Sequence, residues 1–324
     1  MSKYFLIVDI GGTKTSGALF SEDGILMDDY VFVAESKTFS GKNAIYENTK
    51  YVLDTVLEHF GTNDNDILGI GVGAPGPLDS ERGIIIGSPM LGMEKFPLAE
   101  LLYQDYHKPV RVDNDGNLGA LAEQRCGKGA GKNNVLYMTV STGCGGGAVL
   151  NGNVYHGYRD GAAEFGHVSI DLEGKECPCH GKGCLELYAS GTAMNRKMAA
   201  DMQAGKKSSV FEKAGYDPKV VNGKLLSEAA EEGDEYALEM YRQEGYYLGC
   251  ALSIFFNTFS PDVFVLGGGV TKAKKYFHDE LMKQLKSRAV LAVEEERVQY
   301  SEMNDRVVLY GAYYLIKEYL EKAD

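Results

Sequence analysis

The chain has 324 residues, which at about 150 residues per domain predicts two domains, and its 44% hydrophobic and 24% charged residues exclude wholesale disorder. Lys and Arg total 33 against 46 Asp and Glu, and the net charge of -13 argues against binding to nucleic acid or to an anionic membrane. No apolar run approaches the ~20 residues of a membrane span, and residues 1–10 lack the pattern of a signal peptide, so we expect a cytoplasmic protein.

Hydrophobic periodicity and glycine-rich breaks predict strands and helices along the whole chain. The predicted strands cover residues 3–10, 15–20, 25–34, 67–74, 109–112, 135–140, 148–150 and 263–266. The predicted helices cover residues 44–60, 117–125, 184–203, 234–257 and 312–321, and a further helix follows residue 270.

Glycine is abundant, with 40 residues against 8 prolines, and it gathers in turns beside apolar runs. Two turns, within residues 11–13 and 141–147, contain Gly and Thr and each joins two predicted strands. Backbone N–H groups in such turns can hold an anion and the threonine hydroxyl adds a donor, so the pair suits the phosphates of a nucleotide. Taken singly, each turn is more simply explained as a tight hairpin turn with no ligand. The spacing matches neither the P-loop nor the dinucleotide-binding fingerprint.

Three of the six cysteines crowd together at Cys177, Cys179 and Cys184. In a cytosolic chain this spacing is typical of tetrahedral zinc, which needs one more ligand. His180 lies inside the same loop and is a candidate, although ligation by two chain neighbours, Cys179 and His180, is sterically awkward. Four protein ligands leave no open coordination position, so the predicted zinc is structural.

Six motifs carry a resemblance to a known family. Residues 9–14 resemble the first phosphate motif of sugar kinases in the actin-like ATPase superfamily. Motifs similar to those of the ROK family (repressors, open reading frames, kinases) occupy residues 71–79, 114–117, 143–147, 164–167 and 177–186. They occur in the family's order, and with the glycines at 267–269 they span nearly the whole chain. The resemblance implies an α/β, two-domain actin-like ATPase (ribonuclease H-like) fold with a cleft between the domains.

The repeated strand–turn–strand unit places the domain boundary near residue 113. We expect an N-terminal α/β domain over residues 1–113, with a C-terminal helix over residues 306–324 packed back on it. Residues 114–305 form the expected C-terminal α/β domain, which carries the zinc loop.

Phosphoryl transfer to a sugar hydroxyl needs a phosphate cradle, a divalent ion, a positioned acceptor and a base. Asp115 is the predicted base, since a carboxylate at a strand-to-helix junction can point into a cleft, and the resemblance implies the same role. Without the resemblance, residues 114–116 are more simply a turn with a helix cap. Asp9, at the end of the first buried strand, is expected to hold magnesium through water, or else to cap the turn.

The resemblance assigns the other site residues to two sets. The nucleotide set consists of Asp9, Gly11, Gly12, Thr13, Lys14, Thr142, Gly143, Gly268 and Gly269. The sugar set consists of Gly73, Asn114, Asp115, Glu164, His167 and Glu186. Most of these residues also have an ordinary structural explanation when taken alone; Lys14, for example, is equally an exposed hairpin lysine.

The resemblance also implies the fourth zinc ligand, His167, which completes a set with Cys177, Cys179 and Cys184. His180 competes for that position and stands where the family usually has glycine. The zinc would hold the loop that carries Glu186 and the segment that carries Glu164 around the sugar.

These motifs predict an ATP-dependent hexose 6-kinase that uses Mg²⁺ and a structural Zn²⁺, with glucose as the expected substrate, assembled as a homodimer or a higher homo-oligomer. N-acetylmannosamine, N-acetylglucosamine and fructose remain open, because Met90 stands where ROK glucokinases usually have asparagine and the chain has no Trp. A sugar-sensing ROK repressor is disfavoured, because the first strand begins at Lys3 and leaves no room for a helix-turn-helix domain.

Overall fold

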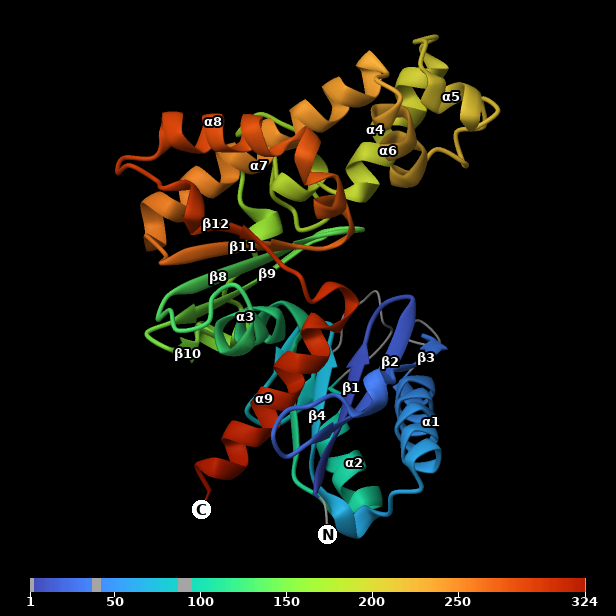
Figure 1. The fold of residues 1–324 in the computed structure, drawn as a ribbon, viewed down its shortest axis with the longest axis vertical. Helices are drawn as coiled ribbons and strands as arrows, with labels where there is room; N and C mark the ends of the chain where they lie inside the picture. The colour runs from blue at the N-terminus through green and yellow to red at the C-terminus, as the bar shows by residue number, and fades with distance from the viewer. Residues whose placement is uncertain (1–2, 37–41, 87–94, 324) are drawn as a thin grey trace. The chain divides into compact units, whose positions relative to one another are not determined.

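The computed structural model describes residues 3–36, 42–86 and 95–323, so Met90 lies outside the described residues. Strands and helices alternate, which confirms the predicted α/β class (Figure 1). One sheet has the order β3-β2-β1-β4-β7 and another the order β10-β9-β8-β11-β12. The strands of the first sheet are β1 (Tyr4–Ile10), β2 (Lys14–Ser21), β3 (Phe32–Glu35), β4 (Ile67–Ala74) and β7 (Val110–Asn114). Those of the second are β8 (Val135–Val140), β9 (Cys144–Leu150), β10 (Asn153–Val154), β11 (Val263–Gly267) and β12 (Val298–Tyr300), and β5 (Leu78–Asp79) pairs with β6 (Ile84–Ile85).

The helices connect and cover these strands. They are α1 (Lys42–Phe60), α2 (Leu98–Tyr106), α3 (Asp115–Cys126), α4 (Gly191–Gln203), α5 (Ser209–Lys213), α6 (Gly223–Glu231), α7 (Glu235–Phe259), α8 (His278–Arg288) and α9 (Val307–Glu321). Within the described ranges, every helix is too short or too polar to span a bilayer.

The chain divides into two compact units. The first comprises residues 1–133, 147–163 and 305–324, and the second comprises residues 134–146 and 164–304. This division differs from the expected boundary near residue 113, because α3 belongs to the first unit. The reason is its packing on α9: Arg125 of α3 forms an ion pair with Glu318 of α9, and Leu118 is buried in the cluster beneath that helix.

Strand β1 shows why the first sheet is covered on both faces. Its side chains alternate between the two faces, as the period of two in a strand requires. Leu6 and Val8 are buried in a cluster with residues of α1 and α2, whereas Phe5 and Ile7 are buried in a cluster with residues of α9. Figure 1 accordingly shows α1 and α9 on opposite sides of this sheet.

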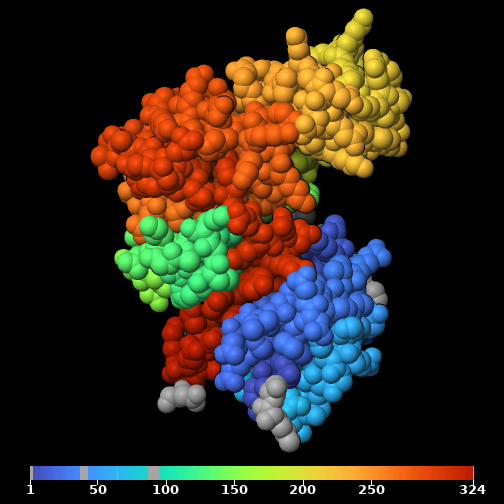
Figure 2. Space-filling model, viewed as in Figure 1, coloured from blue at the N-terminus to red at the C-terminus, as the bar shows by residue number. Residues whose placement is uncertain are grey.

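The C-terminal residues of the first unit lie beside its N-terminal residues. Figure 2 shows red α9 packed against the blue N-terminal segment, although most of the chain separates them in sequence. Arg306 forms an ion pair with Asp29, and the Tyr313 hydroxyl donates to the Glu22 carbonyl at 2.9 Å. Helix α9 therefore closes the face of the sheet that α1 leaves open.

Two of the predicted elements that differ from the structure have a clear local cause. The predicted helix over residues 184–203 begins only at Gly191, because the Ser190 hydroxyl caps the N–H of Ala193 at 3.1 Å and residues 185–187 form a separate 3-10 turn. The predicted strand over residues 25–34 is shorter, since Asp28 and Asp29 adopt positive φ angles. Phe32–Glu35 forms the strand that pairs with β2, and Leu26 makes only an isolated bridge to Phe20.

Candidate functional site

Three parallel strands of the first unit end at one edge, and each end carries a predicted site residue. Asp9 of β1 pairs with Gly73 of β4, and Ala74 of β4 pairs with Asn114 of β7. The carboxyl ends of parallel strands share an edge of the sheet, where α/β proteins bind their ligands. A Cβ atom at position 73 would lie 2.5 Å from Val308 Cγ1 of α9 and 3.4 Å from Asp9 Oδ1, so glycine is needed here for close packing against α9.

Asp115 begins α3 directly after β7. The Asn114 side chain caps the helix, with its Oδ1 accepting the Gly116 N–H at 2.9 Å, and Asp115 Oδ1 accepts the same N–H at 2.8 Å. The cap is the reason that α3 begins two residues before the predicted start. Asp115 is exposed, as a group that exchanges a proton with a ligand must be.

The carboxyl groups of Asp9 and Asp115 act on each other electrostatically. The pKa of Asp9 is raised to about 7, mainly by burial of its carboxyl group and also by the negative charges of Asp115 and Asp305, whereas the positive charge of Lys14 opposes the rise. A divalent cation at this edge would stabilise the ionised form of Asp9 and offset the repulsion. The electrostatics therefore favour a bound cation beside Asp9.

The first glycine turn closes between β1 and β2. Gly11 donates its N–H to the Lys14 carbonyl at 2.9 Å, which leaves Gly12 and Thr13 exposed at the tip. Lys14 Nζ lies 2.7 Å from Asp305 Oδ2 in an exposed ion pair. The turn thus presents backbone N–H groups to solvent, whereas Lys14 is engaged by a carboxylate.

In the second unit the turns after β8 and β11 lie side by side, because these strands are parallel neighbours. Ser141 joins them: its Oγ accepts the Gly269 N–H at 3.3 Å, and its carbonyl accepts the N–H of Gly191 at the start of α4 at 2.7 Å. Gly268 has φ +89°, and a side chain there would lie 2.4 Å from a backbone carbonyl oxygen. This edge therefore gathers the predicted nucleotide residues Thr142, Gly143, Gly268 and Gly269. Sequence reasoning missed Ser141, although it directly precedes the Thr–Gly pair.

Glu186 links this glycine turn to the cysteine loop. Its Oε2 accepts the Cys144 N–H at 2.8 Å, and a side chain at position 143 would lie 2.3 Å from the same oxygen. Gly166 packs on Cys144, where an added side chain would lie 2.2 Å from the Cys144 carbonyl oxygen. The segment that carries Glu164 and His167 is thereby held near Glu186.

Four side chains of the second unit converge as a metal-binding set. Ligand atoms of His167, Cys177, Cys179 and Cys184 all lie within 4.8 Å of one another. The Cys177 Sγ to His167 Nδ1 distance is 3.7 Å and the Cys179 Sγ to Cys184 Sγ distance is 3.5 Å. Zinc bonds of ~2.3 Å to sulfur and ~2.0 Å to nitrogen place tetrahedral ligand atoms about 3.5–3.8 Å apart. The set therefore fits tetrahedral zinc.

His180 is outside this set. It is exposed, with φ +70°, and its N–H donates to the Cys177 carbonyl at 2.8 Å in a turn of the cysteine loop. A Cβ atom added at Gly181 would lie 3.4 Å from Cys179 Sγ. The loop therefore turns around the cysteine sulfur atoms, and the imidazole that lies beside them is that of His167.

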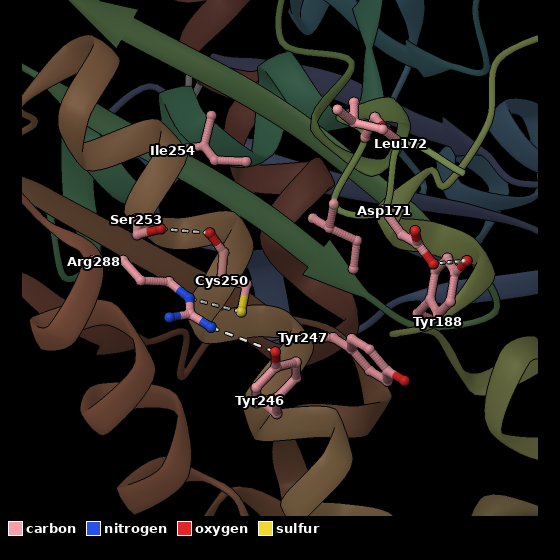
Figure 3. Close-up of a pocket in the computed structure, with 11 residues that line it drawn as sticks. Asp171, Leu172, Tyr188, Tyr246, Tyr247, Cys250, Ser253, Ile254 and Arg288 are labelled. Carbon is pink, nitrogen blue, oxygen red and sulfur yellow. Dashed lines mark hydrogen bonds between the residues drawn. The ribbon is translucent and has the colours of Figure 1, made fainter. Parts of the chain in front are cut away.

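A pocket of about 440 Å³ lies elsewhere in the second unit (Figure 3). It is lined by residues of α7, the end of α8 and residues 169–172, and Tyr246, Cys250 and Arg288 are hydrogen-bonded across it. Its described lining residues include none of the predicted site residues, so this pocket is separate from both edges above.

A buried carboxyl group sits on α7 of the second unit. Glu244 is 1% exposed, and neither of its carboxyl oxygens has a hydrogen-bond partner among the described residues. Burial raises the pKa of Glu244 to about 8, so the folded protein holds this proton at neutral pH. The unfolded chain releases the same proton near pH 4.5.

Replacing Glu244 should change how stability depends on pH. Between pH 4.5 and pH 8 the folded state binds a proton that the unfolded state has lost, so this group makes the free energy of unfolding fall as pH rises, by at most about 1.4 kcal/mol per pH unit. We expect Glu244→Gln to remove that slope, so that its stability relative to the wild type grows from pH 5 to pH 8 in denaturant titrations. Glu239→Gln, on the same helix but with a pKa lowered by Arg242, is the control and should lack this effect. Parallel pH profiles for Glu244→Gln and the wild type would contradict the assignment.

Comparisons with known proteins agree with this architecture. A sequence model of the ROK family matches residues 5–319. A glucokinase from Halalkalibacterium halodurans is 35% identical over 288 residues, which cover 88% of this chain and 84% of that protein. Among solved structures, a ROK family glucokinase from Streptomyces griseus in complex with glucose and AMPPNP is 29% identical, with a TM-score of 0.82 and coverage of 96% of this chain and 98% of that one.

A ROK family transcriptional regulator, a homolog of the E. coli MLC protein, is also similar. It is 25% identical, with a TM-score of 0.84, and the match covers 98% of this chain and 78% of that one. These structures confirm the predicted fold class. Since the family's sequence pattern extends over residues 5–319 and the fold agrees with it, the chain belongs to the ROK family.

Proposed function

We propose that the protein is a glucokinase that transfers the γ-phosphoryl group of ATP to the 6-hydroxyl of glucose. The observation that carries the proposal is the edge of the first sheet, where Asp9 and Asp115 lie close enough for the charge of one to raise the pKa of the other beside Gly73 and Asn114. A carboxylate that can hold a cation and an exposed carboxylate that can act as a base are two of the groups that phosphoryl transfer to a hydroxyl requires of a protein. The glucokinase relative and the glucose-bound structure support the choice of substrate.

In the proposed reaction Asp115 accepts the proton of the sugar hydroxyl as the hydroxyl oxygen bonds to the γ-phosphorus and the bond to the β-phosphate oxygen breaks. The products are glucose 6-phosphate and ADP. Asp9 would hold Mg²⁺, which offsets phosphate charge when bound. Asn114, whose Oδ1 caps α3, is expected to use its amide nitrogen toward a sugar hydroxyl, and Gly73 at the end of β4 is proposed to contact the sugar through its backbone.

The remaining predicted residues are proposed to bind nucleotide or sugar. We propose that two groups of residues hold the nucleotide. One is the first glycine turn, with Gly12 and Thr13 at its exposed tip and Gly11 and Lys14 on either side. The other consists of Thr142, Gly143, Gly268 and Gly269. Glu164, His167 and Glu186 are proposed to hold sugar hydroxyls, which present paired donors and acceptors. His167 can serve twice, because its Nδ1 faces Cys177 Sγ and its Nε2 remains for a hydroxyl.

We propose that the cysteine set holds one structural Zn²⁺. The support is the donor chemistry, three thiols and an imidazole, and the spacing of their atoms. His167, Cys177, Cys179 and Cys184 would all be ligands, so the ion has no position for substrate. Its proposed effect is to fix the loop that ends at Glu186.

The proposed function is tested by ADP release over a panel of sugars. With Mg-ATP we expect turnover with glucose, and we expect kcat/KM for fructose, N-acetylglucosamine and N-acetylmannosamine to stay below ten times the glucose value. A tenfold preference for one of these sugars would make it the assigned substrate in place of glucose and would leave the assignment as a sugar kinase unchanged. If no sugar led to ADP release, the kinase assignment would be wrong. A sugar-sensing regulator would then be favoured, since the chain is also similar in structure to the transcriptional regulator homologous to MLC.

We also propose that the chain forms a homodimer or a higher homo-oligomer in the cytoplasm. Large hydrophobic side chains that line the pocket of the second unit are exposed, with Leu172 80% and Tyr246 40% exposed, and burial of such groups is the usual driving force of association. Light scattering measures the oligomeric state directly, and a monomer at the concentration used in the assays would contradict this proposal.

A further inference from the structure

The carboxylate of Asp113 ties the end of β7 to the first turn of α3. Its side chain is only 2% exposed. Oδ1 accepts the backbone N–H of Asn114 at 2.7 Å and the side-chain N–H of Asn117 at 3.0 Å. Because Asn114 and Asp115 lie between these two contacts, the conformation of both residues depends on the Asp113 carboxylate.

The other oxygen of Asp113 faces a histidine from a distant part of the first unit. His156 Nε2 lies 2.7 Å from Asp113 Oδ2, and the two residues are 43 positions apart in sequence. His156 follows β10, and its carbonyl accepts the N–H of Ala162 at 3.0 Å, so the segment that carries the imidazole is itself anchored. The imidazole is 32% exposed and therefore exchanges protons with solvent.

Three charged groups act on His156. The hydrogen bond to Asp113 raises the pKa of His156 above 6.5, burial opposes the rise, the negative charges of Asp113 and Asp160 add to it, and Arg111 opposes it. The positive charge of protonated His156 strengthens its 2.7 Å contact with the buried Asp113 carboxylate. A carboxylate held in place by this contact is a strong acceptor for the N–H groups of Asn114 and Asn117.

We propose that the His156–Asp113 pair is a positioning pair that sets the orientation of Asn114 and Asp115 and thereby the rate of phosphoryl transfer. The proposal rests on the proposed function of Asp115 as the base. His156 and Asp113 act through the strand–helix junction, not on the substrate, and the pair makes catalysis respond to pH. Protonation of His156 strengthens the pair, and loss of that proton as pH rises through the raised pKa of His156 weakens the pair.

Kinetics on two substitutions of His156 test the pair. His156→Ala removes the contact, and we expect kcat to fall roughly 10- to 100-fold, since small displacements of a catalytic group cost this much. His156→Gln keeps an N–H donor without a titrating group, so we expect a smaller loss of kcat. We also expect this variant to lack the fall in kcat that the proposal predicts for the wild type as pH rises through the pKa of His156. The control is His278→Gln, a half-buried histidine of α8 bonded to Tyr300 at 2.8 Å, which should keep the wild-type pH profile.

An NMR titration separates this proposal from the proposed function. We expect the backbone amides of Asn114 and Asp115 to shift with the same midpoint as the His156 imidazole in the wild type, and to stop doing so in His156→Gln. If the wild type has no kinase activity but these amides follow His156, the pair stands and the proposed function falls. If the wild type is active and neither the amides nor kcat follow His156, the proposal is overturned and the proposed function stands.

Discussion

Asp115→Asn should lower kcat by roughly 10²–10⁴, because the amide keeps the shape of the side chain but cannot accept the proton of the sugar hydroxyl. The Asp115 carboxyl group is exposed at the first position of α3, and its backbone is held by the Asn114 cap and the Asp113 carboxylate. The substitution leaves these contacts in place, so glucose binding should change little. Steady-state kinetics gives kcat, and titration calorimetry on the same variant gives the dissociation constant for glucose.

The matched control for Asp115→Asn is Asp279→Asn. Asp279 is also an aspartate in the first turn of a helix, α8, and is outside the predicted site. Any loss that comes from removing negative charge at a helix N-terminus should appear in both variants, whereas loss of the base should appear only at position 115. Near-normal turnover by Asp115→Asn would reject Asp115 as the base.

Cys184→Ser should remove the bound metal and destabilise the second unit. Protein purified without added zinc should contain about one equivalent, and the variant should contain much less. Since a structural zinc contributes directly to folding, we expect the melting temperature to fall by at least ~5 °C. Glucose binding should also weaken, because Glu186 lies two residues after Cys184 and is bonded to the turn at Cys144. Cys126→Ser, at an exposed cysteine of α3, is the control and should keep its zinc.

Substitution of the two histidines identifies the fourth ligand. We expect His167→Ala to lose zinc and His180→Ala to keep it, because only His167 Nδ1 lies with the three sulfur atoms. The reverse result would assign the fourth position to His180. Retention of one zinc equivalent in Cys184→Ser would show that the cysteine set is not the metal site.

The sequence by itself determined the features that depend on neighbouring residues. Strand β4 and helix α1 are found where hydrophobic periodicity predicts them, because burial repeats every two residues in a strand and about every 3.6 in a helix. The spacing of Cys177, Cys179 and Cys184 likewise indicates a metal loop, since three thiols so close in sequence cannot be far apart in space. Motif order was enough to identify the family.

Only the tertiary structure decided what long-range pairing brings together. The register of β1, β4 and β7 places Asp9 beside Gly73 and Asn114 beside Ala74, and no local pattern encodes that register. Packing on α9 assigns α3 to the first unit, against the predicted boundary. The contact between Asp113 and His156 was missed for the same reason: residues 43 positions apart meet only when strands and helices have packed, and the free energy of that packing belongs to the whole core.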